Sequence, residues 1–126
     1  MKILIGDDQT ATRQLYVAML EQYQCQITEA TTGREVLLSI QAERPDLIVL
    51  DHNMPEMTGY EVIQELQKSP EFKKIPIIFI TGKNFDQEFR DLIKLEVAEF
   101  VPKPFNVETL LEAIEKVTGR PLPPNP

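Results

Sequence analysis

The chain has little that would bind nucleic acid, form disulfides or enter a membrane. It holds one cysteine, and its 13 Lys and Arg residues against 20 Asp and Glu residues give a formal charge of −7. A single cysteine excludes an internal disulfide framework and suits a reducing compartment. An acidic chain without a basic cluster is a poor partner for nucleic acid or anionic membranes. No apolar run approaches the roughly 20 residues of a membrane-spanning helix.

The start of the chain also lacks the features of an export signal. The short apolar run at residues 3–5 is followed almost at once by Asp7 and Asp8, whereas a signal peptide needs a longer apolar segment. We therefore expect a cytoplasmic protein with no membrane insertion. Its 126 residues are enough for one domain with a hydrophobic core of its own.

Short apolar segments alternate with amphipathic segments along the chain. Strands are predicted at residues 2–5, 26–29, 47–50, 77–80 and 100–101. Three of these segments are apolar without alternation, which is typical of strands buried on both faces of a parallel sheet. Apolar residues at helical spacing predict five helices. The residues expected to face inward are Leu15, Ala18, Met19, Gln22 and Tyr23; Val36, Leu37 and Ile40; Val62, Ile63 and Leu66; Phe89, Leu92, Ile93 and Val97; and Leu110, Leu111, Ile114 and Val117.

Start and stop signals agree with these helices. The signals are capping boxes at Thr32 with Glu35 and at Thr58 with Glu61, an N-cap at Asn106, and a stop at Gly119 followed by Pro121. Strict alternation of strands and helices predicts an α/β fold, with a doubly wound, five-stranded parallel sheet and helices on both faces. We expect one domain at residues 1–118. Residues 119–126 are proline-rich and read as an extended tail, either a free terminus or a linker stub.

Charged and polar residues follow four of the predicted strands. Asp7 and Asp8 follow the first, Asp51 the third, Thr81 the fourth and Lys103 the fifth. The carboxyl ends of parallel strands meet at one edge of the sheet, so we expect these side chains around one crevice. Two carboxylates about 4 Å apart repel by about 4 kcal/mol at an effective dielectric of 20, and three of them require a cation. Oxygen-only ligands favour Mg²⁺, with Mn²⁺ as the alternative.

This set of side chains suits phosphoryl transfer. A metal ion, the ammonium of Lys103 and the hydroxyl of Thr81 would together stabilise a transferring phosphoryl group. The sequence offers neither a Ser/His pair nor a glycine-rich phosphate loop. The expected nucleophile is therefore a carboxylate.

The chain resembles the response-regulator receiver domains of two-component signalling. The motifs that carry this resemblance are Asp7-Asp8, Asp51-His52-Asn53-Met54-Pro55 with Gly59, Thr81-Gly82, and Lys103-Pro104-Phe105 preceded by Phe100. Each motif is weak alone, but in this order, each after a predicted strand, they are highly specific. The resemblance covers residues 1 to about 118 and implies a flavodoxin-like receiver fold with strand order 2-1-3-4-5 and five helices.

The resemblance implies a role for each residue of the crevice. Asp51 would accept a phosphoryl group from a phosphohistidine on a sensor histidine kinase or a histidine phosphotransfer protein. Asp8 would bind Mg²⁺ directly and Asp7 through water, with Asp51 and the backbone carbonyl of Asn53 completing the protein ligands. Lys103 would pair first with Asp51 and then with a phosphoryl oxygen.

Further residues would respond to phosphorylation. By the same resemblance, Thr81 would hydrogen-bond the phosphoryl group, Phe100 would follow it inward, and Pro104 would follow a cis peptide bond that orients Lys103. The face made by the fourth helix, fifth strand and fifth helix would then bind a downstream partner or output domain, or form a phosphorylation-dependent homodimer. Its residues would include Phe85, Glu88, Lys94, Glu99, Phe100 and those near Phe105. Such a chain is a signalling domain and not an enzyme, since it catalyses only its own phosphorylation and dephosphorylation.

Two positions are expected to tune the loss of the phosphoryl group. Asn53 lies two residues after Asp51, and Lys83 lies two residues after Thr81. In the family these positions flank the path of the hydrolytic water. Lys83 cannot accept a proton from that water at neutral pH, so we expect it to pair with the phosphoryl group or partly shield it, and thereby to slow hydrolysis.

Other functions fit the sequence less well. A phosphatase of the haloacid dehalogenase type needs a second acid two residues after the nucleophile, where this chain has Asn53. A flavodoxin-like cofactor binder needs a phosphate cradle after the first strand, where Asp7 and Asp8 stand. An interaction module with an inactive site would not need all five key side chains. The sequence leaves open whether the receiver acts alone or belongs to a larger regulator.

Overall fold

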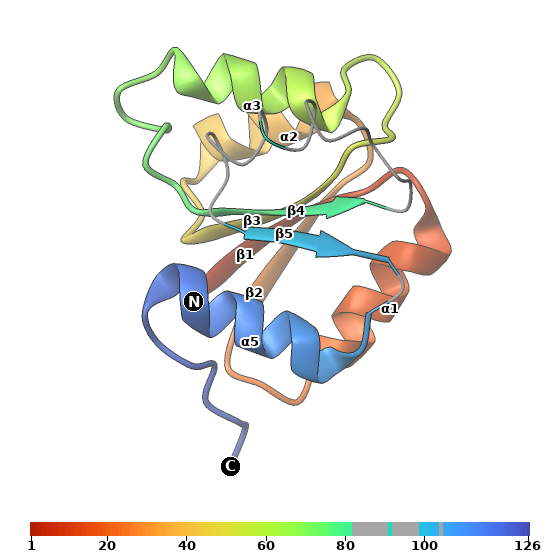
Figure 1. Cartoon of the computed structure of the whole chain (residues 1–126), viewed down its shortest axis with the longest axis vertical. Helices are drawn as coiled ribbons and strands as arrows, with labels where there is room; N and C mark the ends of the chain where they lie inside the picture. Colours follow the sequence, from red (N-terminus) through yellow and green to blue (C-terminus); the bar gives the residue numbers. More distant parts are fainter. Residues whose placement is uncertain (82–90, 92–98, 104) are drawn as a thin grey trace.

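Five parallel strands form one sheet of order β2-β1-β3-β4-β5 (Figure 1). The computed structural model describes residues 1–81, 91, 99–103 and 105–126. The strands are β1 (Lys2–Gly6), β2 (Gln26–Ala30), β3 (Leu47–Asp51), β4 (Ile77–Thr81) and β5 (Glu99–Pro102). The predicted parallel sheet and its strand order are confirmed.

The described part of the chain holds four helices in two layers. They are α1 (Thr10–Leu20), α2 (Gly33–Ala42), α3 (Gly59–Gln67) and α5 (Val107–Thr118). Helices α1 and α5 lie on one face of the sheet and α2 and α3 on the other (Figure 1), which confirms the doubly wound arrangement. The remaining predicted helix, with Phe89, Leu92, Ile93 and Val97, falls outside the described residues. Among the described residues, no helix has the length and apolar character needed to cross a membrane.

Successive strand residues supply two separate cores, because side chains alternate between the faces of a strand. Ile3 and Ile5 of β1 pack toward α1 and α5, whereas Leu4 packs toward α2 and α3. Every residue of β3 is buried. The continuous apolar runs in the sequence thus mark strands that have helices on both sides.

The predicted helix caps are present, with one difference. At α3, the Thr58 hydroxyl accepts from the Glu61 backbone while the Glu61 carboxylate accepts from the Thr58 backbone, which is a complete capping box. At α2, Thr32 caps in the same way, but the carboxylate of Glu35 accepts from the backbone and hydroxyl of Thr31. The predicted signals at the two ends of α5 are also observed, an N-cap at Asn106 and a left-handed Gly119.

The buried face predicted for the first helix is wrong at Leu15, Ala18 and Gln22, whereas Met19 and Tyr23 do pack against the core. Leu15 is 53% exposed and Ala18 is exposed, whereas Tyr16 and Leu20 are buried, at 1% and 0% exposure. The ring of Tyr16 stacks on Phe105, with centroids 5.6 Å apart and planes inclined by 16°. The face of α1 that carries Tyr16 and Leu20, and not the face that carries Leu15, therefore packs against the sheet.

The C-terminal tail is extended, as its prolines dictate, but it does not hang free. Leu122 is buried in the core beneath α1 and α5. The backbone N–H of Gln24 donates to the carbonyl of Pro123 at 2.8 Å, and further hydrogen bonds join residues 124–125 to residues 21–24. The division into a domain at 1–118 and a tail or linker stub at 119–126 stays a prediction.

Candidate functional site

Three carboxylates gather where β1 and β3 end. Asp7 and Asp8 directly follow β1, and Asp51 is the last residue of β3. Each offers a carboxylate oxygen, and these oxygens lie within 4.8 Å of one another. Asp7 and Asp51 are 0% and 4% exposed, whereas Asp8 is exposed. Two buried carboxylates beside a third, exposed one leave a site that attracts positive charge.

Lys103, directly after β5, brings one ammonium to the two buried acids. Its Nζ lies 3.3 Å from Oδ1 of Asp51 and 3.7 Å from Oδ2 of Asp7. Three carboxylates and one ammonium leave a net negative charge. Burial, together with the charge of Asp7, raises the pKa of Asp51, while Lys103 and a backbone hydrogen bond from Asn53 oppose that rise. An ionised Asp51 in this place therefore benefits from a further cation.

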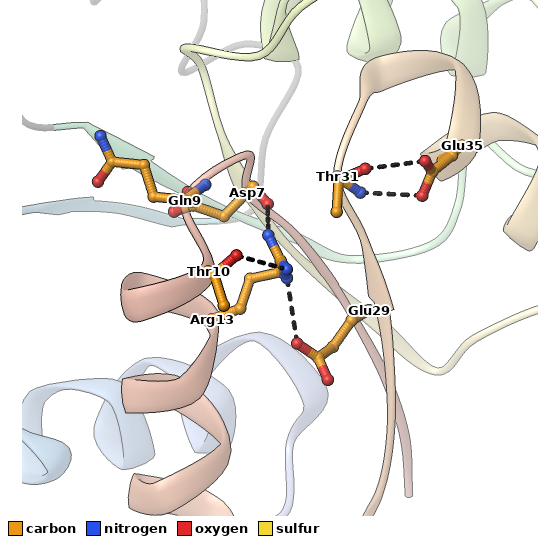
Figure 2. A network of polar contacts seen from close by, with 7 residues as sticks. All are labelled: Asp7, Gln9, Thr10, Arg13, Glu29, Thr31 and Glu35. Carbon is orange, nitrogen blue, oxygen red and sulfur yellow. Dashed lines mark hydrogen bonds and ion pairs between the residues drawn. The ribbon is translucent and has the colours of Figure 1, made fainter.

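Three hydrogen bonds hold Asp7, and Figure 2 shows the one from Arg13 to its carbonyl. Its Oδ1 accepts from the backbone of Gln9 at 2.9 Å, and its own N–H donates to the carbonyl of Ala30 at 3.1 Å. Its carbonyl accepts from Arg13 Nη1 at 2.9 Å, and Arg13 also pairs with Glu29 of β2 at 3.1 Å. Arg13 was not predicted as part of the site. The available signal was an arginine in the first turns of the helix that follows the acidic pair.

The loop after Asp51 passes very close to its own strand. A side chain at Gly59 would collide with the carbonyl oxygen of Asp51, so glycine is required there by space. Within this loop, Met57 donates to the carbonyl of Pro55 at 2.8 Å. The residue between them, Glu56, has a left-handed φ of 68°, which is the strained geometry of a three-residue turn.

The other predicted site residues lie at different depths around these acids. Asn53 is exposed, two residues beyond Asp51. Phe100 is half-buried, and its ring meets that of Phe79 with centroids 5.5 Å apart and planes 44° apart. The only histidine, His52, is half-buried, and its Nδ1 accepts from the backbone of Tyr60 at 3.4 Å.

Several predicted residues fall partly or wholly outside the described structure. The backbone of Thr81 ends β4 in register with Pro102 of β5, which places this residue at the same edge of the sheet as the acids. The side chain of Thr81 falls outside the described part. Outside it altogether are Lys83, Phe85, Glu88, Lys94 and Pro104.

Comparison with known proteins settles the family. The family profile described as "Response regulator receiver domain" matches residues 3–115. The chain belongs to this family. The acidic residues Asp7, Asp8 and Asp51 form the triad typical of receiver Mg²⁺ sites. Receivers are signalling modules, and membership implies a histidine kinase as partner.

Relatives of this receiver include proteins of its own length and longer ones. It is 31% identical to chemotaxis protein CheY1 of Helicobacter pylori, over 94% of this chain and 98% of that protein. It is 30% identical to protein PilH of Pseudomonas aeruginosa, over 92% and 96%. It is 34% identical to a probable transcriptional regulator, ycf27, of Cyanophora paradoxa, over 94% of this chain but only 48% of that regulator.

Solved structures agree with the receiver fold. The chemotaxis response regulator CheY4 of Vibrio cholerae superposes with a TM-score of 0.83 at 32% identity, covering 92% of this chain and 97% of that one. The signal receiver domain of a histidine kinase from Syntrophus aciditrophicus superposes with a TM-score of 0.85 at 27% identity, covering 94% and 89%.

Proposed function

We propose that this receiver takes a phosphoryl group from a phosphohistidine onto Asp51 in a reaction that requires Mg²⁺. The observation that carries the proposal is the position of Lys103, whose ammonium lies 3.3 Å from Asp51 and 3.7 Å from Asp7. One cation shared by two buried acids can move toward new negative charge without leaving the site. The donor would be a sensor histidine kinase or a histidine phosphotransfer protein in the cytoplasm.

Asp7, Asp8 and Asp51 would hold the metal, with the backbone carbonyl of Asn53. These residues fit a hard ion because all their ligand atoms are oxygens and because one carboxylate oxygen from each of the three acids lies within 4.8 Å of the other two. Asp8 would bind directly and Asp7 through water. Mg²⁺, or Mn²⁺ in its place, supplies positive charge to the phosphoryl oxygens.

Asp51 would act as the nucleophile. One of its carboxylate oxygens attacks phosphorus, an O–P bond forms, the P–N bond of the phosphohistidine breaks, and the electron pair leaves with the imidazole nitrogen. The ammonium of Lys103 would then follow the charge onto a phosphoryl oxygen. Thr81 would donate its hydroxyl to another of these oxygens, and Pro104 would help to orient Lys103.

The signal would leave through α5, β5 and the segment between β4 and β5. In the described part of that face, Lys116 of α5 pairs with Glu99 of β5 at 2.8 Å, next to Phe100. Engagement of Thr81 would draw Phe100 inward and change this surface. The face would then bind a downstream protein or an output domain, or support a homodimer that depends on phosphorylation.

The decisive experiment is intact mass spectrometry after treatment with phosphoramidate, with and without Mg²⁺. We expect a gain of one phosphoryl group only when Mg²⁺ is present, and no gain in Asp51→Asn. Asp46→Asn is the matched control, because Asp46 is exposed at the start of β3, where it accepts from the backbone of Lys2. A wild-type protein that gains no mass under any condition would contradict the proposal.

We also propose that Lys83 and Asn53 set the lifetime of the phosphorylated form. The charge of Lys83 would shield the phosphoryl group from water. Lys83→Ala should therefore lose the phosphoryl group faster than wild type, measured as the decay of phosphorylated mass after removal of the donor. An unchanged or slower decay would show that Lys83 has no such role.

A further inference from the structure

Tyr16 of α1 carries a polar group into an apolar place. The residue is 1% exposed, and its ring packs in the core between the sheet and helices α1 and α5. Its stack on Phe105 holds the ring in a fixed orientation. In the described structure its hydroxyl is buried and has no hydrogen-bond partner. A buried hydroxyl without a partner is costly, so the position calls for an explanation.

The core around Tyr16 lies directly beneath the charged site. It includes the residues two positions before Asp7, Asp51 and Lys103, which are Ile5, Val49 and Val101. Because residues two apart in a strand point to the same face, Asp51 faces the α1 side of the sheet. Burial, and to a lesser degree the charges of Asp7 and Asp51, raise the pKa of Tyr16. The hydroxyl therefore keeps its proton at neutral pH and remains a donor.

Asp7 offers an acceptor whose charge acts on the Tyr16 hydroxyl. In the part of the chain that the structure describes, the Tyr16 hydroxyl and Oδ2 of Asp7 are the two buried side-chain polar atoms without a hydrogen bond. Oδ1 of Asp7 is already satisfied by the backbone of Gln9. Among the described residues, Oδ2 pairs with the ammonium of Lys103, 3.7 Å away. That ammonium is the group that the proposed reaction would draw toward a phosphoryl oxygen.

We infer that Tyr16 is a positioning residue whose hydroxyl donates to Oδ2 of Asp7 when Lys103 turns to the phosphoryl group. This inference rests on the proposed function. In the unphosphorylated protein the unpaired hydroxyl lowers the stability of the fold. In the phosphorylated protein it would replace the departing ammonium of Lys103 as the partner of Oδ2. Because α1 holds the donor and β1 holds the acceptor, the new hydrogen bond would tighten α1 against the site.

The test is a comparison of Tyr16→Phe with wild type. Phenylalanine keeps the ring, the stack and the packing, and removes only the hydroxyl. Without ligand, Tyr16→Phe should melt at the same temperature as wild type or higher. Beryllofluoride is a stable mimic of a phosphoryl group on aspartate. At fixed Mg²⁺, the beryllofluoride concentration that gives half the maximal rise in Tm should increase about tenfold, the fold-change of one hydrogen bond to a charged group.

Tyr23→Phe is the matched control, because Tyr23 is half-buried in the same core but lies beside the C-terminal tail. It should bind beryllofluoride as wild type does. Equal half-saturation in Tyr16→Phe and wild type would overturn the inference while the proposed function stands, and so would an equal loss in Tyr23→Phe. A Tyr16→Phe protein that melts lower without ligand would show a merely structural role. A wild type that neither gains mass with phosphoramidate nor responds to beryllofluoride would overturn both proposals.

Discussion

The two edges of the sheet are built from different interactions. At the carboxyl ends of the strands, charged side chains meet: Lys103 lies within 3.7 Å of two buried carboxylates. At the amino ends, two backbone hydrogen bonds and two from side-chain amides join residues 21–24 to residues 123–125, with Leu122 buried beneath them. The described ion pairs at that end, Lys2 with Glu43 and Lys116 with Glu99, use lysine side chains that are 48% and 72% exposed.

The difference separates chemistry from stability. Buried like charges destabilise the fold, and binding of a cation offsets that destabilisation. Backbone hydrogen bonds and apolar burial stabilise the fold and take no part in the chemistry. Substitutions of the charged groups at the carboxyl-end edge should therefore change phosphorylation, and substitutions there that relieve repulsion or backbone strain should raise stability. Substitutions at the amino-end edge should change unfolding and leave phosphorylation intact.

The largest effect is expected for Lys103→Met. Methionine keeps the unbranched stem but removes the ammonium, so the rate of Mg²⁺-dependent mass gain with phosphoramidate should fall roughly 100-fold. The control is Lys2→Met, at the opposite edge, where the lysine side chain is 48% exposed. It should leave the rate unchanged and have little effect on the free energy of unfolding, because an exposed ion pair stabilises a protein only weakly. Similar phosphorylation rates in the two variants would show that the chemistry is not confined to the carboxyl-end edge of the sheet.

Leu122→Ala should have the next largest effect, on stability alone. Removing a buried leucine side chain from the tail should lower the free energy of unfolding in urea by about 2 kcal/mol. Phosphorylation by phosphoramidate should proceed at the wild-type rate. Leu38→Ala is the matched control, since Leu38 is 58% exposed, and should change stability by no more than about 0.5 kcal/mol. A loss of phosphorylation in Leu122→Ala would mean that the two edges are coupled.

The destabilisation caused by the buried charges at the carboxyl-end edge should make the free energy of unfolding depend on pH. Burial raises the pKa of Asp51 above its ordinary 3.8. At pH values between 3.8 and this raised pKa, the folded protein therefore binds more protons than the unfolded chain. Stability is therefore lost as pH rises from below 3.8 through the raised pKa, at no more than about 1.4 kcal/mol per pH unit. Without metal, Asp51→Asn should gain stability relative to wild type over this window. Urea midpoints that differ by the same amount at every pH would refute this.

The smallest effect is expected in the loop beside Asp51. Glu56 holds a left-handed φ of 68°, which costs an ordinary residue about 1 kcal/mol and costs glycine nothing. Glu56→Gly should therefore raise the free energy of unfolding by up to about 1 kcal/mol. Glu71→Gly, in a turn whose residues have negative φ, should not raise it. A higher free energy of unfolding in both variants would show that backbone strain at Glu56 is not the cause.

The sheet and its acidic edge could be predicted because each depends on local sequence. Continuous apolar runs mark the buried strands, and an acid directly after a strand must lie at its carboxyl end. Asp7, Asp51 and Lys103 are far apart in the sequence, but their positions after three strands still predicted that they lie close together. Every described helix after α1 also begins at a cap that is readable within four residues.

The features that escaped prediction depend on partners distant in sequence. Tyr16 is buried on α1 and stacks on Phe105, which lies 89 residues later in the sequence, whereas the spacing of aliphatic residues alone predicted that Leu15 faces inward. Arg13 binds a backbone carbonyl and Glu29, neither of which a helical pattern reveals. The docking of the tail uses carbonyls of Pro123 and Pro124, and any residue type offers a carbonyl. The roles of Asn53, Thr81, Lys83, Phe100 and Pro104 stay predictions.

The position of the docked tail also determines where a fluorophore or a surface anchor can be attached without blocking the site. Residues 123–125 are held beside the α1–β2 connection, and the C-terminus lies far from the loops that carry Asp7 and Asp51 (Figure 1). A fluorophore or surface anchor joined after Pro126 would thus point away from an approaching kinase. The same attachment at the N-terminus would disturb Met1, whose carbonyl accepts from Gln26 at 2.8 Å. The C-terminal end is therefore the better handle for immobilising this receiver while its phosphorylation is followed.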